Sequence, residues 1–356
     1  MIEQRLARLY AMMDTGGVDG IIVTKPENRH YFSGFTGSAG VLLISRQTQK
    51  VLTDFRYIEQ ANQQAPLYQV VRHGASLFET LAEHCRDMGM VRVGFESDFV
   101  TWEFYQKLAE RLTAIELRPV TLDVLRMVKD QSELELLTKA VEIADFAFDQ
   151  TLKIIKPGIT ELEVALELEY QMRKLGAEKP AFDTIVASGA RGALPHGRAT
   201  NKVIEAGDFI TMDFGAVYQG YHSDMTRTVV AGRATDKQRE IYNIVLEAQL
   251  AGVNAVKAGK RGKEIDAVSR QIIADAGYSE YFGHGLGHGV GLFIHEEPRL
   301  SPLGEVVLAE GMVVSVEPGI YLPDWGGVRI EDLVAVSAAG CTILTASSKD
   351  LIEIAN

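Results

Sequence analysis

The sequence predicts an N-terminal α/β domain followed by an α+β domain that contains an internal duplication. In residues 19–120, short apolar runs alternate with charged, helix-like stretches, which is typical of an α/β domain with a parallel or mixed sheet. Residues 121–131 are charged and lack a strand pattern. Beyond them, helix and strand patterns recur at an offset of roughly 100 residues. We therefore expect two domains, residues 1–128 and 129–356, with the boundary near Lys129.

Composition indicates a globular chain and excludes several classes of function. The chain has 356 residues, 46% of them hydrophobic and 24% charged, which is enough for each domain to have its own core. No apolar run reaches the roughly 18 residues needed to span a bilayer, so no membrane partner is expected. The net charge of −12 argues against a nucleic-acid partner, which requires a basic face.

The N-terminus and the cysteines indicate where the protein works. Residues 1–17 mix charged and apolar side chains, which predicts an amphipathic helix and not a signal peptide, whose central stretch is uncharged. Cys85 and Cys341 are the two cysteines, and they lie far apart in sequence. Such sparse cysteine usage suits a reducing compartment and implies no disulfide framework. We therefore expect a cytoplasmic protein.

In the N-terminal domain, the short apolar runs predict strands and the stretches between them predict helices. Strands are expected at residues 20–24, 40–44, 50–53, 69–71, 91–95 and 115–117. Helices are expected at residues 57–64, 76–87 and 102–111. Nothing in this domain gathers catalytic residue types, because its histidines in the second half, His73 and His84, stand alone.

The second domain is expected to begin with a long helix. Its first turn fits a capping box made by Ser132 and Glu135. Two later helices then match each other: one follows Gly158 and ends at Gly176, and the other follows Gly259 and ends at Gly277, so both glycine pairs are 101 residues apart. A duplicated unit of this kind predicts two halves that face each other across a pseudo-twofold axis, with a site between them.

Matched carboxylates follow the strands of the two halves. At an offset of 104 residues Asp213 aligns with Glu317, and each follows an apolar strand and precedes a glycine by two positions. A further strand in each half carries a second carboxylate, Asp224 and Glu331, at spacings of 11 and 14 residues that fit a returning hairpin. One acid at a strand end is usually a solvated turn residue, but four in two matched pairs indicate a common site.

Four carboxylates in one cleft require positive charge between them. Without it they repel one another and raise their own pKa values. Two divalent cations would balance the four charges, and a water bridging the ions would lose a proton near neutral pH and become a nucleophile. The sequence therefore predicts a dinuclear metal site.

The glycine-rich segment 282–292 offers the nitrogen ligand that such a site needs. Five glycines in nine residues exclude a stable helix, since each costs about 1 kcal/mol relative to alanine. The segment is therefore expected to be a loop or strand whose backbone packs closely. His284 and His288 lie in it, and the zincin motif fails because Arg299 stands where the second histidine after His295 would be.

The second domain resembles the metallopeptidases of the pita-bread fold, the family of methionine aminopeptidase, aminopeptidase P and prolidase. The resemblance covers residues 125–356 and rests on Met212-Asp213-Phe214-Gly215, Ser223-Asp224-Met225-Thr226-Arg227-Thr228, Gly287-His288-Gly289, Glu317-Pro318-Gly319 and Gly327-Val328-Arg329-Ile330-Glu331-Asp332. The first 120 residues resemble the α/β domain that precedes the catalytic domain in the prolidase and aminopeptidase P branch. Methionine aminopeptidases lack that domain.

The resemblance implies two divalent metal ions per subunit, bound by Asp213, Asp224, His288, Glu317 and Glu331. Asp213 would bridge or chelate one ion, Asp224 and Glu331 would bridge both, and His288 and Glu317 would complete the ligands of the second ion. Glu317 would also act as general base for the bridging water. Manganese, cobalt, zinc or iron would suit this oxygen-rich set, and manganese is the preferred expectation.

The resemblance also implies roles for residues around the ions. His196 and His295 would stabilise the gem-diolate oxygen and the leaving proline nitrogen. His284 and Arg299 would bind substrate, with Arg299 gripping the carboxylate of a dipeptide, although a surface salt bridge is an equal alternative for this arginine. Arg329 would orient the ligand carboxylates.

The implied activity is hydrolysis of the bond before proline, most directly in Xaa-Pro dipeptides, by a homodimer. The main alternative is an aminopeptidase P that acts on longer Xaa-Pro peptides. A metal-free C–N hydrolase of the creatinase type is disfavoured by the five intact ligands. A catalytically inactive pita-bread binding protein is disfavoured by the intact His196, His288 and His295.

Overall fold

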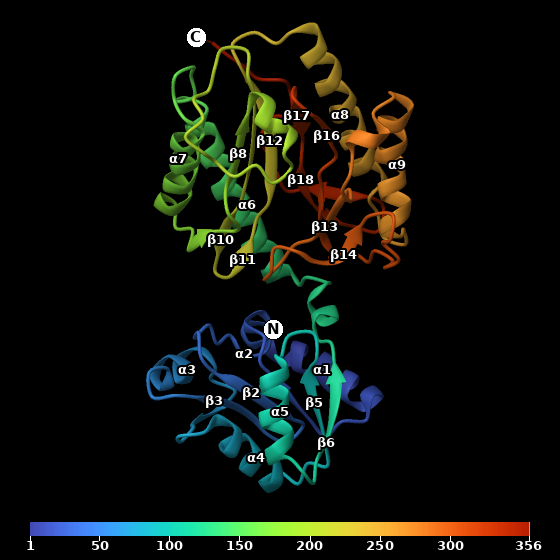
Figure 1. Ribbon diagram of the computed structural model, residues 1–356. Helices are drawn as coiled ribbons and strands as arrows, with labels where there is room; N and C mark the ends of the chain where they lie inside the picture. The colour runs from blue at the N-terminus through green and yellow to red at the C-terminus, as the bar shows by residue number, and fades with distance from the viewer. Residues whose placement is uncertain (356) are drawn as a thin grey trace. The chain divides into compact units, whose positions relative to one another are not determined.

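The computed structural model describes residues 1–355. The chain divides into two compact units, Met1–Arg126 and the residues from Met127 onward. Figure 1 shows the helices and strands of each unit. Within the described residues, none of the helices combines the length and the apolar character needed to cross a membrane.

The first unit is built on a mixed sheet with strand order β4-β3-β2-β1-β5-β6. At its centre, β1 runs antiparallel to β2 and parallel to β5. The strands are β1 (Gly20–Val23), β2 (Val41–Ser45), β3 (Gln49–Thr53), β4 (Gln69–Arg72), β5 (Arg92–Glu96) and β6 (Glu116–Val120). The helices are α1 (Ile2–Gly16), α2 (Pro26–Ser33), α3 (Ile58–Gln64), α4 (Leu77–Asp87) and α5 (Trp102–Arg111), and the 3-10 helix η1 spans Asp123–Arg126. The α/β unit with a largely parallel or mixed sheet is confirmed, and the sheet is the mixed one of the two.

The sequence pattern did not predict α2, because three of its polar residues, Asn28, Arg29 and Ser33, are buried. The side-chain amide of Asn28 donates a 2.6 Å hydrogen bond to the carboxylate of Glu96, and Arg29 donates a 2.7 Å bond to the carbonyl of Gly40. These hydrogen bonds offset the free-energy cost of burying the polar side chains. Because these buried residues are polar, the helix lacks the apolar periodicity that would predict it from sequence.

The second unit opens with α6 (Gln131–Thr151), whose capping box differs from the predicted one. The N-cap is Asp130, whose carboxylate accepts the backbone N–H of Glu133, while the Glu133 carboxylate accepts the N–H of Asp130. The predicted box of Ser132 and Glu135 is therefore wrong by two residues. Ser132 instead donates its hydroxyl to the Asp130 carboxylate at 2.5 Å, which supports the earlier start.

The predicted duplication is visible in two matched helices, α7 (Glu161–Lys174) and α9 (Gly262–Asp275), which begin and end 101 residues apart. Their first turns are closed in the same way. Glu163 accepts the backbone N–H of Thr160 at 2.7 Å, and Glu264 accepts that of Arg261 at 2.7 Å. The helix α8 (Asp236–Ala255) occupies the place in the second half that α6 has in the first.

The strands of the two halves also correspond. In the first half β9 pairs antiparallel with β12, and in the second half β15 pairs antiparallel with β18. A shorter hairpin lies between the paired strands of each half, β10 with β11 and β16 with β17. The larger sheets have the orders β20-β12-β9-β8 and β14-β13-β15-β18-β19.

The first-half elements of this unit are β7 (Lys179–Pro180), β8 (Ile185–Ser188), the 3-10 helix η2 (Gly189–Ala193), β9 (Phe209–Phe214), β10 (Ala216–Tyr218), β11 (Tyr221–His222) and β12 (Met225–Ala231). The second-half elements are η3 (Ser279–Tyr281), β13 (Gly287–Gly289), β14 (Glu296–Leu300), β15 (Val313–Val316), β16 (Gly319–Leu322), β17 (Gly326–Arg329), β18 (Asp332–Val336), β19 (Cys341–Ile343) and β20 (Glu353–Ile354).

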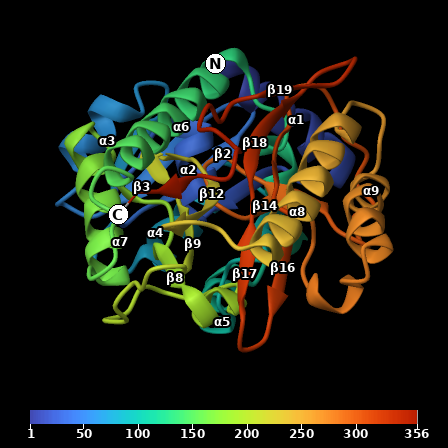
Figure 2. The ribbon, with the colours of Figure 1, turned by 90° about the horizontal axis from the view of Figure 1, so that it is seen from above.

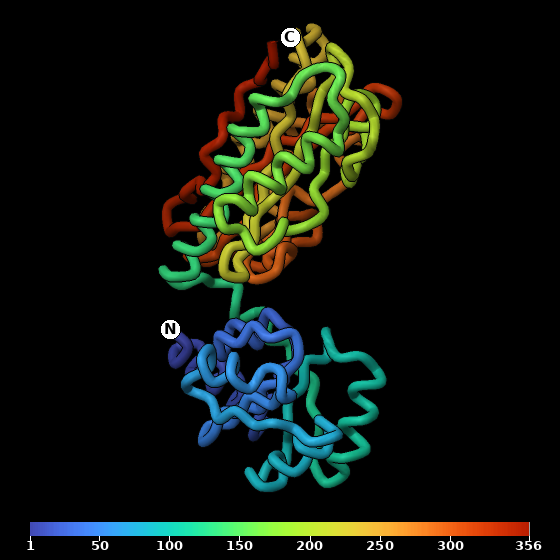
Figure 3. The backbone as a smooth tube through the Cα atoms, turned by 90° about the vertical axis from the view of Figure 1, so that its left-hand side faces the viewer, coloured from blue at the N-terminus to red at the C-terminus, as the bar shows by residue number. Residues whose placement is uncertain are grey.

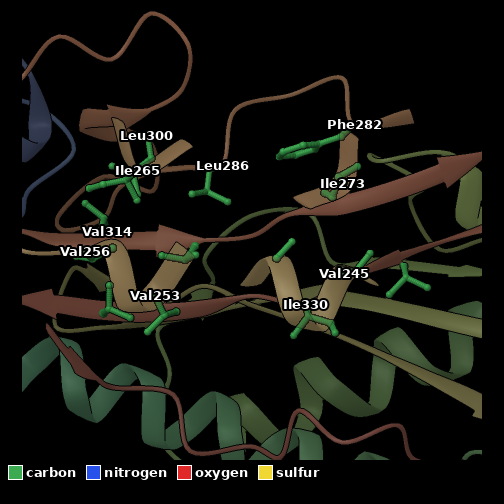
Figure 4. Close-up of a cluster of buried hydrophobic side chains, with 14 of the residues drawn as sticks. Val245, Val253, Val256, Ile265, Ile273, Phe282, Leu286, Leu300, Val314 and Ile330 are labelled. Carbon is green, nitrogen blue, oxygen red and sulfur yellow. The ribbon is translucent and has the colours of Figure 1, made fainter. Parts of the chain in front are cut away.

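Helices cover the strands of the second unit on both flanks. Figure 2 shows α6 and α7 on one side and α8 and α9 on the other, and the backbone trace of Figure 3 shows α6 and α7 running side by side. One buried core joins α8 and α9 to the second-half strands and also includes Phe209 of β9 and Val230 of β12. A separate core joins α6 and α7 to the first-half strands. In Figure 4, Val245 and Val253 of α8 and Ile273 of α9 lie in the former core.

Candidate metal centre

Four carboxylates come from equivalent places in the two halves. Asp213 lies in β9, and Glu317 directly follows β15. Asp224 stands between β11 and β12, and Glu331 stands between β17 and β18. The second pair therefore sits where a strand is interrupted, and not within a continuous strand as the sequence predicted. The interruption frees these side chains from the alternation of a regular strand.

The returning strands bring these side chains into one cluster. Ligand oxygens of Asp213, Asp224 and Glu331 all lie within 4.8 Å of one another. His288, in the short strand β13, places its Nε2 atom 3.5 Å from Asp224 Oδ2 and 3.4 Å from Glu317 Oε1. The structure thus gathers all five residues proposed as metal ligands.

Close packing of glycines positions the imidazole. A Cβ atom added to Gly287 would lie 2.1 Å from the carbonyl oxygen of Ser315, and one added to Gly289 would lie 2.3 Å from that of Glu297. Only glycine allows the neighbouring strands to approach β13 this closely. The predicted loop or strand with closely packed backbone is confirmed for this segment.

In the cluster, burial and the mutual repulsion of the carboxylates outweigh the single positive charge of Arg329. Burial raises the pKa of Asp224, and the charges of Glu331, Asp213 and Glu317 raise it further. Burial likewise raises the pKa of Glu331, with Glu317 and Asp213 adding to the shift. Burial raises the pKa of Glu317 to about 8, although Arg329 opposes the shift. Divalent cations would lower these raised pKa values, because a positive charge favours the ionised form of a carboxylate.

The remaining polar atoms also fit cations. Asp213 Oδ1 and Glu331 Oε1 are buried and have no hydrogen-bond partner among the described residues. Burial lowers the pKa of His288 to about 4, with His295 contributing, so that its imidazole is neutral at physiological pH. Orphaned carboxylate oxygens beside a neutral imidazole are the donor set of a site for hard or borderline divalent metals.

Arg329 fixes the orientation of Asp213. Its guanidinium donates a 2.6 Å hydrogen bond to Asp213 Oδ2, a 2.8 Å bond to the Tyr321 hydroxyl and a 3.0 Å bond to the Thr226 hydroxyl. Thr226 in turn donates a 2.8 Å bond to Glu331 Oε2. The side chain of Arg329 is 3% exposed, so these bonds are made away from solvent. One arginine therefore orients carboxylates from both halves.

His284 belongs to the same network. Its Nε2 atom lies 2.9 Å from the Tyr321 hydroxyl, and its Nδ1 atom lies 2.7 Å from the carbonyl oxygen of Gly285. Because Arg329 donates to the Tyr321 oxygen, the Tyr321 hydroxyl can donate its own proton to Nε2 of His284. The Nδ1–H group of His284 then donates to the carbonyl oxygen of Gly285. Both ring nitrogens are engaged, so a hydrogen bond from His284 to substrate would require release of one of them.

The other predicted site residues are more exposed. The rings of His288 and His295 are 4.5 Å apart between centroids, in an edge-to-face arrangement. His196 is exposed, and its charge helps to lower the pKa values of His284 and His295, although burial is the larger cause for both. Arg299 has a 72% exposed side chain and lies 3.4 Å from Glu297. Arg299 and His295 are two of the exposed alternating positions along the β14 segment.

Sequence reasoning missed three polar residues that support the ligands: Thr226, Tyr321 and Ser315. The Ser315 hydroxyl donates a 3.2 Å bond to Glu317 Oε1 and accepts the N–H of His288 at 3.1 Å. A signal existed for Ser315, because it lies in β15 two positions before Glu317 and strand alternation places such residues on the same side. Thr226 had no local signal, since its partners Glu331 and Arg329 lie far away in sequence. Tyr321 had no such signal, since its partners depend on the β16–β17 hairpin.

Comparison with known proteins identifies relatives over nearly the whole chain. The family model "Metallopeptidase family M24" matches residues 135–338, and "Creatinase/Prolidase N-terminal domain" matches residues 5–128. An Xaa-Pro dipeptidase of Pyrococcus horikoshii is 41% identical over 99% of both chains. The structure of an Xaa-Pro dipeptidase from Bacillus anthracis has 49% identity and a TM-score of 0.96, covering 99% of each chain. The structure of an X-Pro aminopeptidase from Thermotoga maritima has 42% identity and a TM-score of 0.89, covering 94% of this chain and 97% of that one.

Proposed function

The chain belongs to metallopeptidase family M24, and from this premise we propose that it hydrolyses the peptide bond before proline in Xaa-Pro dipeptides with two divalent metal ions bound at the carboxylate cluster. The single observation that carries this proposal is the cluster itself. Asp213, Asp224 and Glu331 present oxygens within 4.8 Å of one another, and Asp213 and Glu331 each have an orphaned oxygen, beside the neutral imidazole of His288. The relatives named Xaa-Pro dipeptidase support the choice of substrate.

The proposed ligands are Asp213, Asp224, His288, Glu317 and Glu331. Ions bound there would polarise the scissile carbonyl and lower the pKa of a bound water. This chemistry suits a proline substrate, because polarisation of the carbonyl does not depend on an amide N–H, which the bond before proline lacks. An oxygen-rich set with one imidazole suits manganese, cobalt, zinc or iron, and we propose manganese.

The chain's own groups then handle protons and charge. Glu317, held by the Ser315 hydroxyl, would accept the proton of the attacking water and pass it on. His295 beside His288, and His196, would stabilise the oxyanion and the leaving nitrogen. Arg299 would bind the free carboxylate of the dipeptide from the exposed side of β14, in exchange for its contact with Glu297. His284 would support substrate binding through Tyr321.

An aminopeptidase acting on longer Xaa-Pro peptides is the second candidate. The relative from Thermotoga maritima named X-Pro aminopeptidase, at 42% identity, supports it. We also propose a homodimer in a cytoplasmic setting. The sparse cysteines favour the setting, and light scattering of the purified protein would test the assembly.

The test uses the purified full chain with measured metal content. Activity on an Xaa-Pro dipeptide is compared with activity on the matched Xaa-Ala dipeptide and on an Xaa-Pro tripeptide. We expect cleavage of the Xaa-Pro dipeptide alone, lost after chelation and dialysis and restored by manganese. Full activity after exhaustive chelation would rule out the metal proposal, and faster tripeptide cleavage would establish the aminopeptidase.

A further inference from the structure

Glu161, the first residue of α7, is a buried carboxylate outside the metal cluster. Its side chain is fully buried. Oε1 accepts the backbone N–H of Ser188 at 2.7 Å and its hydroxyl at 2.9 Å. Oε2 accepts the N–H of Thr200 at 3.1 Å, its hydroxyl at 2.8 Å, and an ion-pair bond from Arg191. This one side chain therefore ties together both ends of the segment 188–200.

The segment held by Glu161 carries His196. Arg191 extends the connection, because its second guanidinium nitrogen donates a 2.8 Å bond to the carbonyl of Arg198. The N–H of Arg198 donates in turn to the carbonyl of His196 at 2.9 Å. A chain of hydrogen bonds thus leads from Glu161 to the backbone of a histidine that the proposed mechanism uses.

The other face of the segment is fixed to the metal centre. A Cβ atom added to Gly192 would lie 2.9 Å from the backbone nitrogen of Gly327 in β17. The carbonyl of Pro195, the neighbour of His196, accepts a 3.2 Å bond from Arg329, which also binds Asp213. The segment is therefore clamped between Glu161 and the strand that carries Arg329.

The duplication separates this role from helix capping. Glu163 caps α7, and its counterpart Glu264 caps α9 in the same way. The counterpart of Glu161 is Gly262, so a carboxylate at this position is not part of the repeated fold. A Cβ atom on Gly262 would lie 2.0 Å from the carbonyl oxygen of Arg299. Each helix start thus holds a segment near an exposed histidine, by a carboxylate in one half and by close packing in the other.

We propose that Glu161 is a positioning residue that holds the His196 segment in the geometry needed for catalysis. The proposal rests on the role that the proposed function gives to His196. A displacement of about 1 Å in a catalytic group can cost on the order of a hundredfold in rate. Loss of the carboxylate should therefore lower kcat, while metal binding, which uses other side chains, stays intact.

The test compares Glu161→Gln with Glu163→Gln as a matched control in the same helical turn. The new amide in the first variant turns one acceptor into a donor that faces the donors of Arg191 and Thr200. In the control, the exposed side chain keeps an amide oxygen that can still accept the N–H of Thr160, as Gln238 accepts that of Thr235 in α8. We expect Glu161→Gln to lower kcat about 10- to 100-fold with little change in KM or manganese content. The control should keep kcat within about twofold.

A double variant decides whether Glu161 acts through His196. If it does, Glu161→Gln combined with His196→Ala should lose no more activity than His196→Ala alone. Fully multiplicative losses, or equal losses of kcat in Glu161→Gln and its control, would overturn the proposal. A measurement independent of activity is the NMR signal of the His196 ring in isotope-labelled, metal-free protein, assigned by its loss in His196→Ala.

That signal should shift or broaden in Glu161→Gln and stay unchanged in Glu163→Gln. An unchanged signal in both would also overturn the positioning role. Full activity of His196→Ala would instead refute the role given to His196 in the proposed function, and the NMR comparison would still report whether Glu161 positions the ring.

Discussion

Arg329 donates a 2.6 Å hydrogen bond to Oδ2 of Asp213 and leaves Oδ1 of the same carboxylate buried, with no partner among the described residues. The two oxygens therefore have different tasks. The arginine sets the plane of the carboxylate, and the remaining oxygen is left for the cation that we propose. The same guanidinium also contacts Tyr321 and Thr226, so the orientation depends on its fork-shaped set of donors.

Arg329→Lys keeps the charge but loses the fork, because one ammonium group cannot meet all these acceptors at once. We expect the manganese affinity or the activity to fall roughly 10- to 100-fold, which is the usual effect of losing a side chain that orients a metal ligand. Calorimetric titration of manganese into the stripped variant measures the binding. Arg118→Lys, an exposed arginine paired with Glu116, serves as control. Unchanged affinity and turnover in Arg329→Lys would show that the network is not needed.

Asp213→Asn and Glu331→Gln each remove a charge that balances the proposed ions. Both variants should lose the activity and retain less metal after gel filtration, because a neutral amide binds divalent cations more weakly than a carboxylate. Elemental analysis of the purified variants measures the metal-to-protein ratio. Wild-type metal content together with wild-type turnover in either variant would remove that residue from the ligand set.

Stability of the metal-free protein should fall as pH rises from about 6.5 to 8.5. Burial raises the pKa values of Asp224 and Glu331 and brings that of Glu317 to about 8, so above pH 6.5 the folded state holds protons that the unfolded state has lost. His288, with its pKa lowered to about 4, is neutral in the folded state across this window.

Thermal unfolding at several pH values checks this expectation. Tm of the stripped protein should decrease across the window, and Glu317→Gln should flatten the decrease because it removes one titrating group. Manganese should raise Tm most at high pH, where the carboxylates are ionised. A Tm of the stripped protein that stays constant or rises with pH contradicts the assigned pKa shifts.

Arg299→Ala tests how a dipeptide would be recognised. Loss of a charge-assisted hydrogen bond costs about 1.5–3 kcal/mol, or roughly ten- to more than hundredfold. We expect kcat/KM for an Xaa-Pro dipeptide to fall by that factor, while its C-terminal amide, which has no carboxylate, is cleaved as before. Equal losses of kcat/KM for both substrates would show that Arg299 does not bind the substrate carboxylate. Its role would then be structural, through the contact with Glu297.

The carboxylate pairs could be predicted from sequence because local hydrophobic patterns predict the strands that carry or precede them. Asp213 and Glu317 follow apolar runs, and the returning strands bring Asp224 and Glu331 beside them. The capping box of α6 shows the limit of such patterns. Two candidates with the same spacing, Asp130 with Glu133 and Ser132 with Glu135, overlap in the sequence, and only the contacts in the folded chain select the first.

Residues whose partners lie far away in sequence gave no local signal. Tyr321 owes its place to Arg329 and His284, and Glu161 meets Thr200 only after the segment between them folds back. The helix α2 was missed for the same reason, since Asn28 reaches Glu96 across 68 residues. Such contacts depend on tertiary structure, which a period of two or 3.6 residues does not encode.

The duplicated architecture has a consequence for how the protein resists unfolding. Each half supplies two of the four carboxylates, so neither half alone offers the full ligand set proposed here. Ions held between the halves would link them, so the halves could separate only after metal–ligand bonds had broken. Metal loading should therefore slow the unfolding rate, and not only shift the equilibrium, if the halves part before their separate cores dissolve. The same ions would then govern both the chemistry and the lifetime of the folded chain.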